Sequence, residues 1–268
     1  MKLKNNIIAL LVLAGSAFVV PAKAAVTFTA GDLILAVRSA TEAQTYMVNL
    51  GSSVSYRDAA ADISSIVNIN TDLDAAFPGW ENRADVTWSI FGVRASSTVV
   101  APVSGDPGQT IYVSRAESTV GTQVAAFATP SSTNHTNAAV SMSGIQVEFA
   151  NGTPTSLPNA TILADASTLY DTAGATWSAF NSSVKGNFGA GTAGTALDLF
   201  RSLGTLTGAS PSGTLRSGSY EGTFHINDAG TVSYTLNAGI APEPSRALLL
   251  GIGAVGFIFR RRRSPAKA

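Results

Sequence analysis

The chain has 268 residues with 17 basic and 17 acidic side chains, and 45% of its residues are hydrophobic. It contains no cysteine, which excludes disulfides, thiol catalysis and cysteine-based metal sites. Nine of the 17 basic residues, but only one of the 17 acidic residues, lie in 1–24 or 242–268, so 25–241 carries eight basic and 16 acidic side chains. Such an acidic body has no electrostatic reason to bind nucleic acid or an anionic membrane.

The N-terminus has the three parts of a secretory signal peptide. Two lysines precede an apolar run over 7–20, and Ala22-Lys23-Ala24 follows as a cleavage site of the A-x-A type. The run is too short for a membrane-spanning helix, and small residues follow it. The sequence therefore predicts a signal helix in 1–24 that signal peptidase removes, which leaves Ala25 as the first residue.

The first half of the body is predicted to be mostly extended. Residues 26–37 begin with polar–apolar alternation and end in an apolar cluster, which predicts a strand buried on both faces in its second part. Residues 44–50 are its predicted hairpin partner. Two more strands are predicted at 86–95 and 110–115, since apolar side chains recur at every second position.

Helical signals are fewer. Thr71 is a candidate cap for a short helix that Pro78 and Gly79 would end. Ala138, Met142, Ile145 and Phe149 recur at helical spacing and predict an amphipathic helix over 134–149.

Strand patterns return in the last part of the body. Residues 161–170 and 195–203 have apolar patterns typical of ordered segments. A hairpin is predicted from 219–226 and 231–236 around Asn227-Asp228-Ala229-Gly230. The predicted fold class is mainly β, as an antiparallel sheet or sandwich with a few short helices.

One segment resembles a calcium loop. Asn70, Asp72, Asp74 and Glu81 occupy positions 1, 3, 5 and 12 of such a loop. However, Ala75 stands where the tight turn requires glycine, and a helix start explains the same acidic residues through the helix dipole. We therefore predict no metal site and no cofactor.

The residues that could carry catalysis or sugar binding form no motif. His135 lies in a polar run and His225 in the last hairpin, and no Gly-x-Ser-x-Gly elbow surrounds a serine. Trp80 and Trp177 lie near turns where they could stack on sugars, although anchoring in the core is the favoured interpretation, and Trp88 is in register with a buried strand face. A polysaccharide hydrolase would need two carboxylates that face each other across a cleft, and the sequence does not identify such a pair.

The C-terminal segment 241–268 has three parts in a fixed order. Pro242, Glu243 and Pro244 form an extended stretch, since a residue before proline avoids helical angles. An uncharged run over 247–259 follows, which is predicted to form a membrane helix of about 20 Å. Four arginines then form a stop signal that stays on the cytoplasmic side: Arg260, Arg261, Arg262 and Arg263.

This arrangement resembles the PEP-CTERM sorting signal of exported bacterial proteins. The resemblance implies recognition at the inner membrane by an exosortase, a membrane-embedded cysteine transpeptidase, and removal of the tail near the Pro-Glu-Pro motif. The body, in stretches such as 31–35, 46–51 and 85–92, also resembles a group of exported PEP-CTERM proteins, and that likeness implies no catalytic residue.

These observations predict one secreted β-rich domain over 25–240 between a signal peptide and a sorting signal. We expect a non-enzymatic protein of the cell surface or extracellular matrix, with a structural or adhesive role in an exopolysaccharide biofilm. Its expected partners are signal peptidase, the exosortase, the inner membrane during sorting, and exopolysaccharide. The alternatives are a carbohydrate-binding module and, second, an extracellular polysaccharide hydrolase.

Overall fold

The computed structural model describes residues 26–39, 41–42, 44–95, 105–127, 130–164, 186–188, 196–204 and 218–236. The described strands are β1 (Asp32–Ser39), β2 (Gln44–Ser52), β3 (Ile63–Asn68), β4 (Val86–Val93), β5 (Ile111–Ala116), β6 (Thr153–Pro154), β7 (Ala160–Ala164), β8 (Gly186–Asn187), β9 (Leu197–Ser202), β10 (Ser219–Ile226) and β11 (Thr231–Leu236). The described helices are α2 (Ser53–Arg57), α3 (Asn70–Ala76), the 3-10 helix η2 (Trp80–Asn82) and α4 (Ser132–Phe149).

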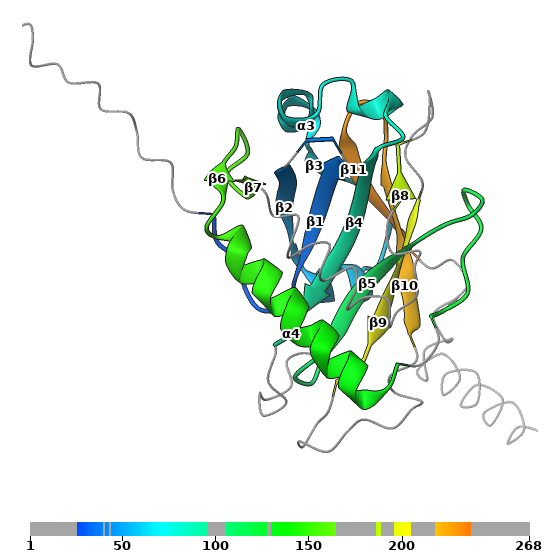
Figure 1. Cartoon of the computed structure of the whole chain (residues 1–268). Helices are drawn as coiled ribbons and strands as arrows, with labels where there is room; N and C mark the ends of the chain where they lie inside the picture. The colour runs from blue at the N-terminus through cyan, green and yellow to red at the C-terminus, as the bar shows by residue number, and fades with distance from the viewer. Residues whose placement is uncertain are drawn as a thin grey trace, which may run out of the picture.

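All of these strands belong to one sheet in which every pair is antiparallel. The order is β3-β11-β10-β9-β5-β4-β1-β2-β7-β6, and β8 pairs with the first residues of β4 (Figure 1). Strands that follow one another in sequence, such as β1 and β2 or β10 and β11, form hairpins. By contrast, β9 joins the β10–β11 hairpin to β5, across more than 80 residues of chain.

The sheet curls around one core and carries a second core on its other face. The inner face holds Leu33, Leu35 and Val37 from β1, in the middle of the sheet, and Ile63 from the edge strand β3 packs against the same cluster. Ala160 of β7, near the opposite edge, also belongs to it. Because strands from both ends of the sheet share one core, the sheet is strongly curved.

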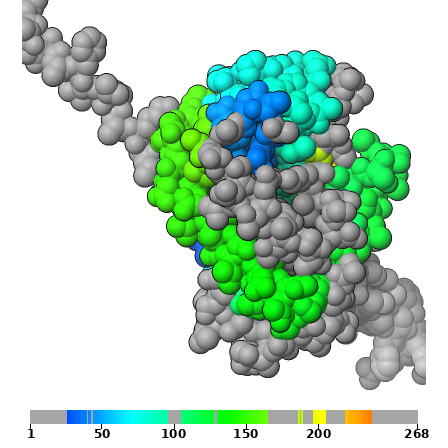
Figure 2. All heavy atoms as spheres, in the orientation of Figure 1, coloured from blue at the N-terminus to red at the C-terminus, as the bar shows by residue number. Residues whose placement is uncertain are grey.

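The outer face is covered by α4. Alternate residues of β1, Ile34 and Ala36, point to this side and pack with Ala138, Met142 and Phe149 of the helix. The Gln146 side chain adds a hydrogen bond of 3.2 Å to the carbonyl of Asp32. In Figure 1 the helix lies diagonally across the sheet, and Figure 2 shows that its other side forms part of the molecular surface.

Several sequence predictions are confirmed. The β10–β11 hairpin, strands β2, β4 and β5 and the long helix form close to their predicted bounds, and β1 pairs with β2 as predicted. Gly230 has the positive φ of 70° that the last turn requires. The mainly antiparallel β class is also confirmed.

Other predictions need correction. Residues 26–31 are not part of a strand, since β1 begins only at Asp32. The sandwich alternative is wrong, because the strands form one continuous sheet. Strand β3 was not predicted, since a half-exposed edge strand shows no regular alternation. Thr71 does not cap α3, because the helix begins at Asn70 with Ile69 as its N-cap.

Candidate functional site

A group of charged side chains around the buried Asp106 lies on the inner face beside α2. We call Arg57, Asp106, Tyr112, Arg201 and Glu221 the ionic cluster. Asp106 is 2% exposed. Its carboxylate accepts hydrogen bonds from Arg57 Nη1 at 2.9 Å, Arg201 Nη1 at 3.4 Å and the Tyr112 hydroxyl at 2.7 Å. The cluster therefore connects α2, β5 and β9 through one carboxylate.

A bulge in β10 adds Glu221 to the cluster. The pairing with β9 shifts between Tyr220 and Gly222, so Glu221 is the extra residue. Its carboxylate lies 3.2 Å from Arg201 Nε and accepts a hydrogen bond of 2.7 Å from the Ser219 hydroxyl. Burial raises the pKa of Glu221, against the opposing effects of Ser219 and Arg201.

The charges in the ionic cluster compensate one another. Within the cluster, the two guanidinium groups of Arg57 and Arg201 face the two carboxylates of Asp106 and Glu221. Outside the cluster, Arg57 also binds the exposed Asp58 at 2.7 Å. Asp106 and Glu221 contact the same arginine, Arg201. A glycoside hydrolase instead requires two carboxylates that face the substrate across a cleft. The geometry of the cluster therefore favours a role in stabilising the fold over a role as a catalytic acid–base pair.

A second pair of acids lies on the outer face, under the segment 117–127. The Glu117 and Asp198 side chains are both buried, and each accepts a hydrogen bond of 2.6 Å from an amide of this segment, Gly121 and Val124 respectively. Burial, and then the neighbouring Asp198, raise the pKa of Glu117. Each carboxylate binds a backbone amide of the segment above it, whereas the two catalytic carboxyls of a retaining glycosidase face a substrate across a cleft.

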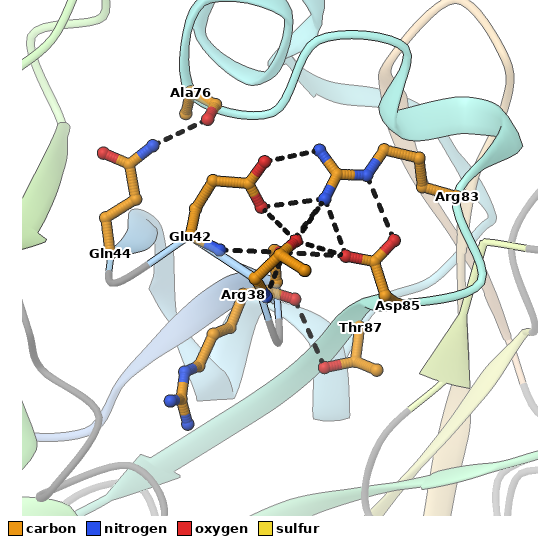
Figure 3. A network of polar contacts seen from close by, with 9 residues as sticks. Arg38, Glu42, Gln44, Ala76, Arg83, Asp85 and Thr87 are labelled. Carbon is orange, nitrogen blue, oxygen red and sulfur yellow. Dashed lines mark hydrogen bonds and ion pairs between the residues drawn. The ribbon is translucent and has the colours of Figure 1, made fainter.

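Figure 3 shows a third polar group, which we call the clasp. The Arg83 guanidinium lies between the carboxylates of Glu42 and Asp85, at 2.7 Å and 2.6 Å. It also donates to the hydroxyls of Ser39 and Thr41. The clasp ties the β1–β2 turn to the residues just before β4. Because its five polar side chains bind one another, it resembles a structural tie more than a ligand site.

The clasp makes part of the stability of the fold depend on pH. Hydrogen bonding to Arg83, and then to Ser39, lowers the pKa of Glu42 to about 2. A lowered carboxyl pKa contributes stability above the unfolded value, and this contribution is lost as pH falls from about 4.5 to about 2. We expect Arg83→Gln to lower the melting temperature at pH 7 by about 2–4 °C, because the ion pairs are partly exposed. Calorimetry should show a smaller difference in melting temperature between this variant and the unaltered protein at pH 3 than at pH 7. An equal difference at both pH values would contradict this assignment.

The calcium-loop interpretation is wrong in this fold. Residues from Asn70 to Ala76 form helix α3 and not a metal-binding loop. Asp72 accepts hydrogen bonds from Thr155 Oγ1 at 2.6 Å, and from the Ser156 amide and hydroxyl at 3.0 and 2.5 Å. Burial opposes the charge of Asp72, but these hydrogen bonds outweigh it and lower its pKa. Asp72 therefore attaches the β6–β7 turn to α3. Within the described ranges, no group of three or more acidic, histidine or cysteine side chains could hold a metal ion.

The histidines and tryptophans lie mostly in the core. His135 is buried on α4, and His225 of β10 points away from the inner-face residues Phe224 and Ile226. Trp80 is 1% exposed and Trp88 is fully buried, and both rings pack on Phe188, with ring centroids 4.8 and 6.2 Å away. Trp80 cannot present its ring to a sugar from this position. The other candidate for sugar stacking, the tryptophan at position 177, lies outside the described residues.

The residues of the sorting signal and the signal peptide also lie outside the described residues: Ala22, Ala24, Ala25, Pro242, Glu243, Pro244, Arg260, Arg261, Arg262 and Arg263. Among the helices that are described, none has the length and apolar character needed to cross a membrane. Comparison of the chain with protein-family profiles, curated proteins and solved structures finds no match.

The ionic cluster and the acid pair were not predicted from the sequence. Asp106 lies in a loop rich in proline and glycine, and its partners Arg57 and Arg201 are 49 and 95 residues away. Asp198 stands at an outward position between Leu197 and Leu199, whose side chains belong to the inner core. An isolated acidic residue in an apolar strand is the one sequence signal that could have indicated it.

Proposed function

We propose that the chain is an exported protein whose C-terminal segment is a PEP-CTERM sorting signal. The observation that carries the proposal is the order of three features in 241–268, namely the Pro-Glu-Pro motif, the uncharged run 247–259 and the four arginines. The apolar run can enter the inner membrane while the arginines remain on the cytoplasmic side. The extended stretch before the run would then lie at the outer surface of that membrane, within reach of an exosortase.

We further propose a structural or adhesive role at the cell surface or in the exopolysaccharide matrix. Three features of the body support it. Its buried charges are compensated by one another, its two buried tryptophans serve the core, and an excess of acidic residues keeps it away from anionic partners. The burial of Trp80 removes one of the two tryptophans on which a carbohydrate-binding function would depend.

The intact mass of the protein from its producing bacterium tests the two processing steps. We expect a product that begins at Ala25 and ends near Pro242–Ser245, because signal peptidase and an exosortase each remove one terminus. A product that begins at Ala25 but retains Ala268 would make the apolar run a lasting anchor and would refute exosortase processing.

Deletion of 242–268 tests the sorting itself, and we expect the shortened protein to be misplaced. A matched variant replaces Pro242, Glu243 and Pro244 with alanine and keeps the apolar run and the arginines. If a specific enzyme recognises the motif, this variant should remain uncleaved in the inner membrane fraction. Unchanged location of both variants, measured by cell fractionation, would contradict the proposal.

A further inference from the structure

The turn that leads from α4 to β6 contains the dipeptide Asn151-Gly152 (Figure 1). Asn151 is the only asparagine of the chain that is followed by glycine. It comes directly after Ala150, the C-cap of α4, and it is exposed. Its backbone amide donates to the Glu148 carbonyl at 2.9 Å. The end of the helix therefore holds the backbone of Asn151, while the residue remains open to water.

The side-chain amide of Asn151 has no hydrogen-bond partner among the residues that the structure describes. Other asparagines of the body are held in place. The side-chain amides of Asn68 and Asn159, for example, each donate to a backbone carbonyl, at 2.8 and 2.7 Å. The Asn151 side chain is thus free to turn its carbonyl carbon towards the nitrogen of the next residue.

The backbone nitrogen of Gly152 is the nucleophile beside this carbon. Glycine has no side chain to hinder the approach. The Gly152 amide also makes only a long hydrogen bond, of 3.5 Å, to the Phe149 carbonyl. The fold requires glycine at this position, because a Cβ atom on Gly152 would clash with the Thr161 hydroxyl and approach Leu163 Cδ2 to 2.9 Å. The packing against β7 therefore keeps the unhindered nitrogen next to Asn151.

We propose that Asn151 is a site of spontaneous deamidation. The Gly152 nitrogen attacks the side-chain carbonyl carbon, a new C–N bond forms, and the bond from this carbon to the side-chain nitrogen breaks. Ammonia leaves with the proton of the Gly152 nitrogen, and a cyclic imide remains. Water then opens the imide at one of its two carbonyl carbons, which gives either aspartate or isoaspartate. This modification depends on residues of the body and does not depend on the sorting proposal.

Both products place a new negative charge at the end of α4. The C-terminal end of a helix carries the negative end of the helix dipole, and Glu148 already adds an acidic side chain to the last turn. We expect the aspartate product to lower the melting temperature by about 1–4 °C, the effect of one unfavourable charge at a helix end. The Asn151→Asp variant reproduces this product, and calorimetry should show the same decrease.

Peptide mapping of the folded, full-length protein measures the modification. After incubation at mildly alkaline pH, the peptide that contains Asn151 should gain about 1 Da, because a hydroxyl group replaces the side-chain amino group. Hydroxylamine, which attacks the imide, should cut the chain between Asn151 and Gly152. Asn137 is the internal control. It is also exposed, but it is followed by Ala138 within α4, where helical hydrogen bonds hold the backbone amides, so its peptide should keep its mass.

Asn151→Gln is the matched variant. It keeps the amide but lengthens the side chain by one methylene, which makes ring closure slower, so we expect no mass gain over the same period. Three results would overturn the proposal. The first is equal conversion of Asn137 and Asn151. The second is conversion only after unfolding in urea, since the fold would then protect the site. The third is a mass gain at Asn151 without cleavage by hydroxylamine, which would exclude attack by Gly152.

Discussion

Replacing Asp106 with asparagine is expected to lower the free energy of unfolding by about 3–5 kcal/mol, the usual cost of breaking a buried ion pair from one side. The variant keeps the size of the side chain but removes the charge that faces both Arg57 and Arg201, at 2.9 and 3.4 Å. The Arg57 and Arg201 guanidinium groups, whose side chains are only 9% and 22% exposed, would then lose the carboxylate that they share. Urea unfolding followed by circular dichroism measures the loss.

Asp58→Asn is the matched control for this prediction. Asp58 binds the same arginine, Arg57, but its side chain is 57% exposed, so water can replace it. We expect a change of about 1 kcal/mol or less, as for other surface ion pairs. Equal losses in the Asp58 and Asp106 variants would mean that water reaches the inner face at α2, and the ionic cluster would then deserve a new test as a ligand site.

Trp80→Ala is expected to cost about 3–5 kcal/mol, the range for removing a large aromatic side chain from a core. The indole packs edge-on against Phe188 and lies among the inner-face residues of the curled sheet. Its Nε1 has no hydrogen-bond partner among the described residues. Trp80→Phe should therefore cost much less than alanine, because it keeps an aromatic ring and removes the unsatisfied N–H group.

The same two variants distinguish a core residue from a sugar platform. A core role predicts a loss of stability with no specific effect on glycan binding, measured on a glycan array with the folded Trp80→Phe protein. A platform role predicts the reverse, with unchanged unfolding and lost binding. Val120→Ala is the control for an exposed apolar side chain and should change stability by no more than about 0.5 kcal/mol.

Local patterns predicted those parts of the fold that are made by neighbours in sequence. The β10–β11 hairpin follows from two alternating strands around a turn with Gly230, whose positive φ glycine adopts without strain. Helix α4 follows from apolar residues at helical spacing, and Ser131 caps it by accepting a hydrogen bond from the Asn134 amide. In both cases the determining interactions lie within a few residues.

Glu221 illustrates where local patterns fail. Phe224 of the same strand points to the inner face, so strict alternation would place Glu221 on the outer face. The bulge between Tyr220 and Gly222 changes the alternation and turns the carboxylate towards Arg201. At Gly222 itself, an added Cβ would lie 2.3 Å from the Tyr234 hydroxyl, so the bulge depends on glycine and on the neighbouring strand β11.

By itself, the sequence determined the mainly β class, the two hairpins, the long helix and the expectation of export and sorting, because each depends on composition or on residues close together in the chain. Only the tertiary structure decided that the sheet curls around one core, that Asp72 binds Thr155 and Ser156 instead of calcium, and that Asp198 accepts a hydrogen bond from the Val124 amide. These contacts join segments about 80 residues apart. The order of the strands brings them together, and no local periodicity encodes that order.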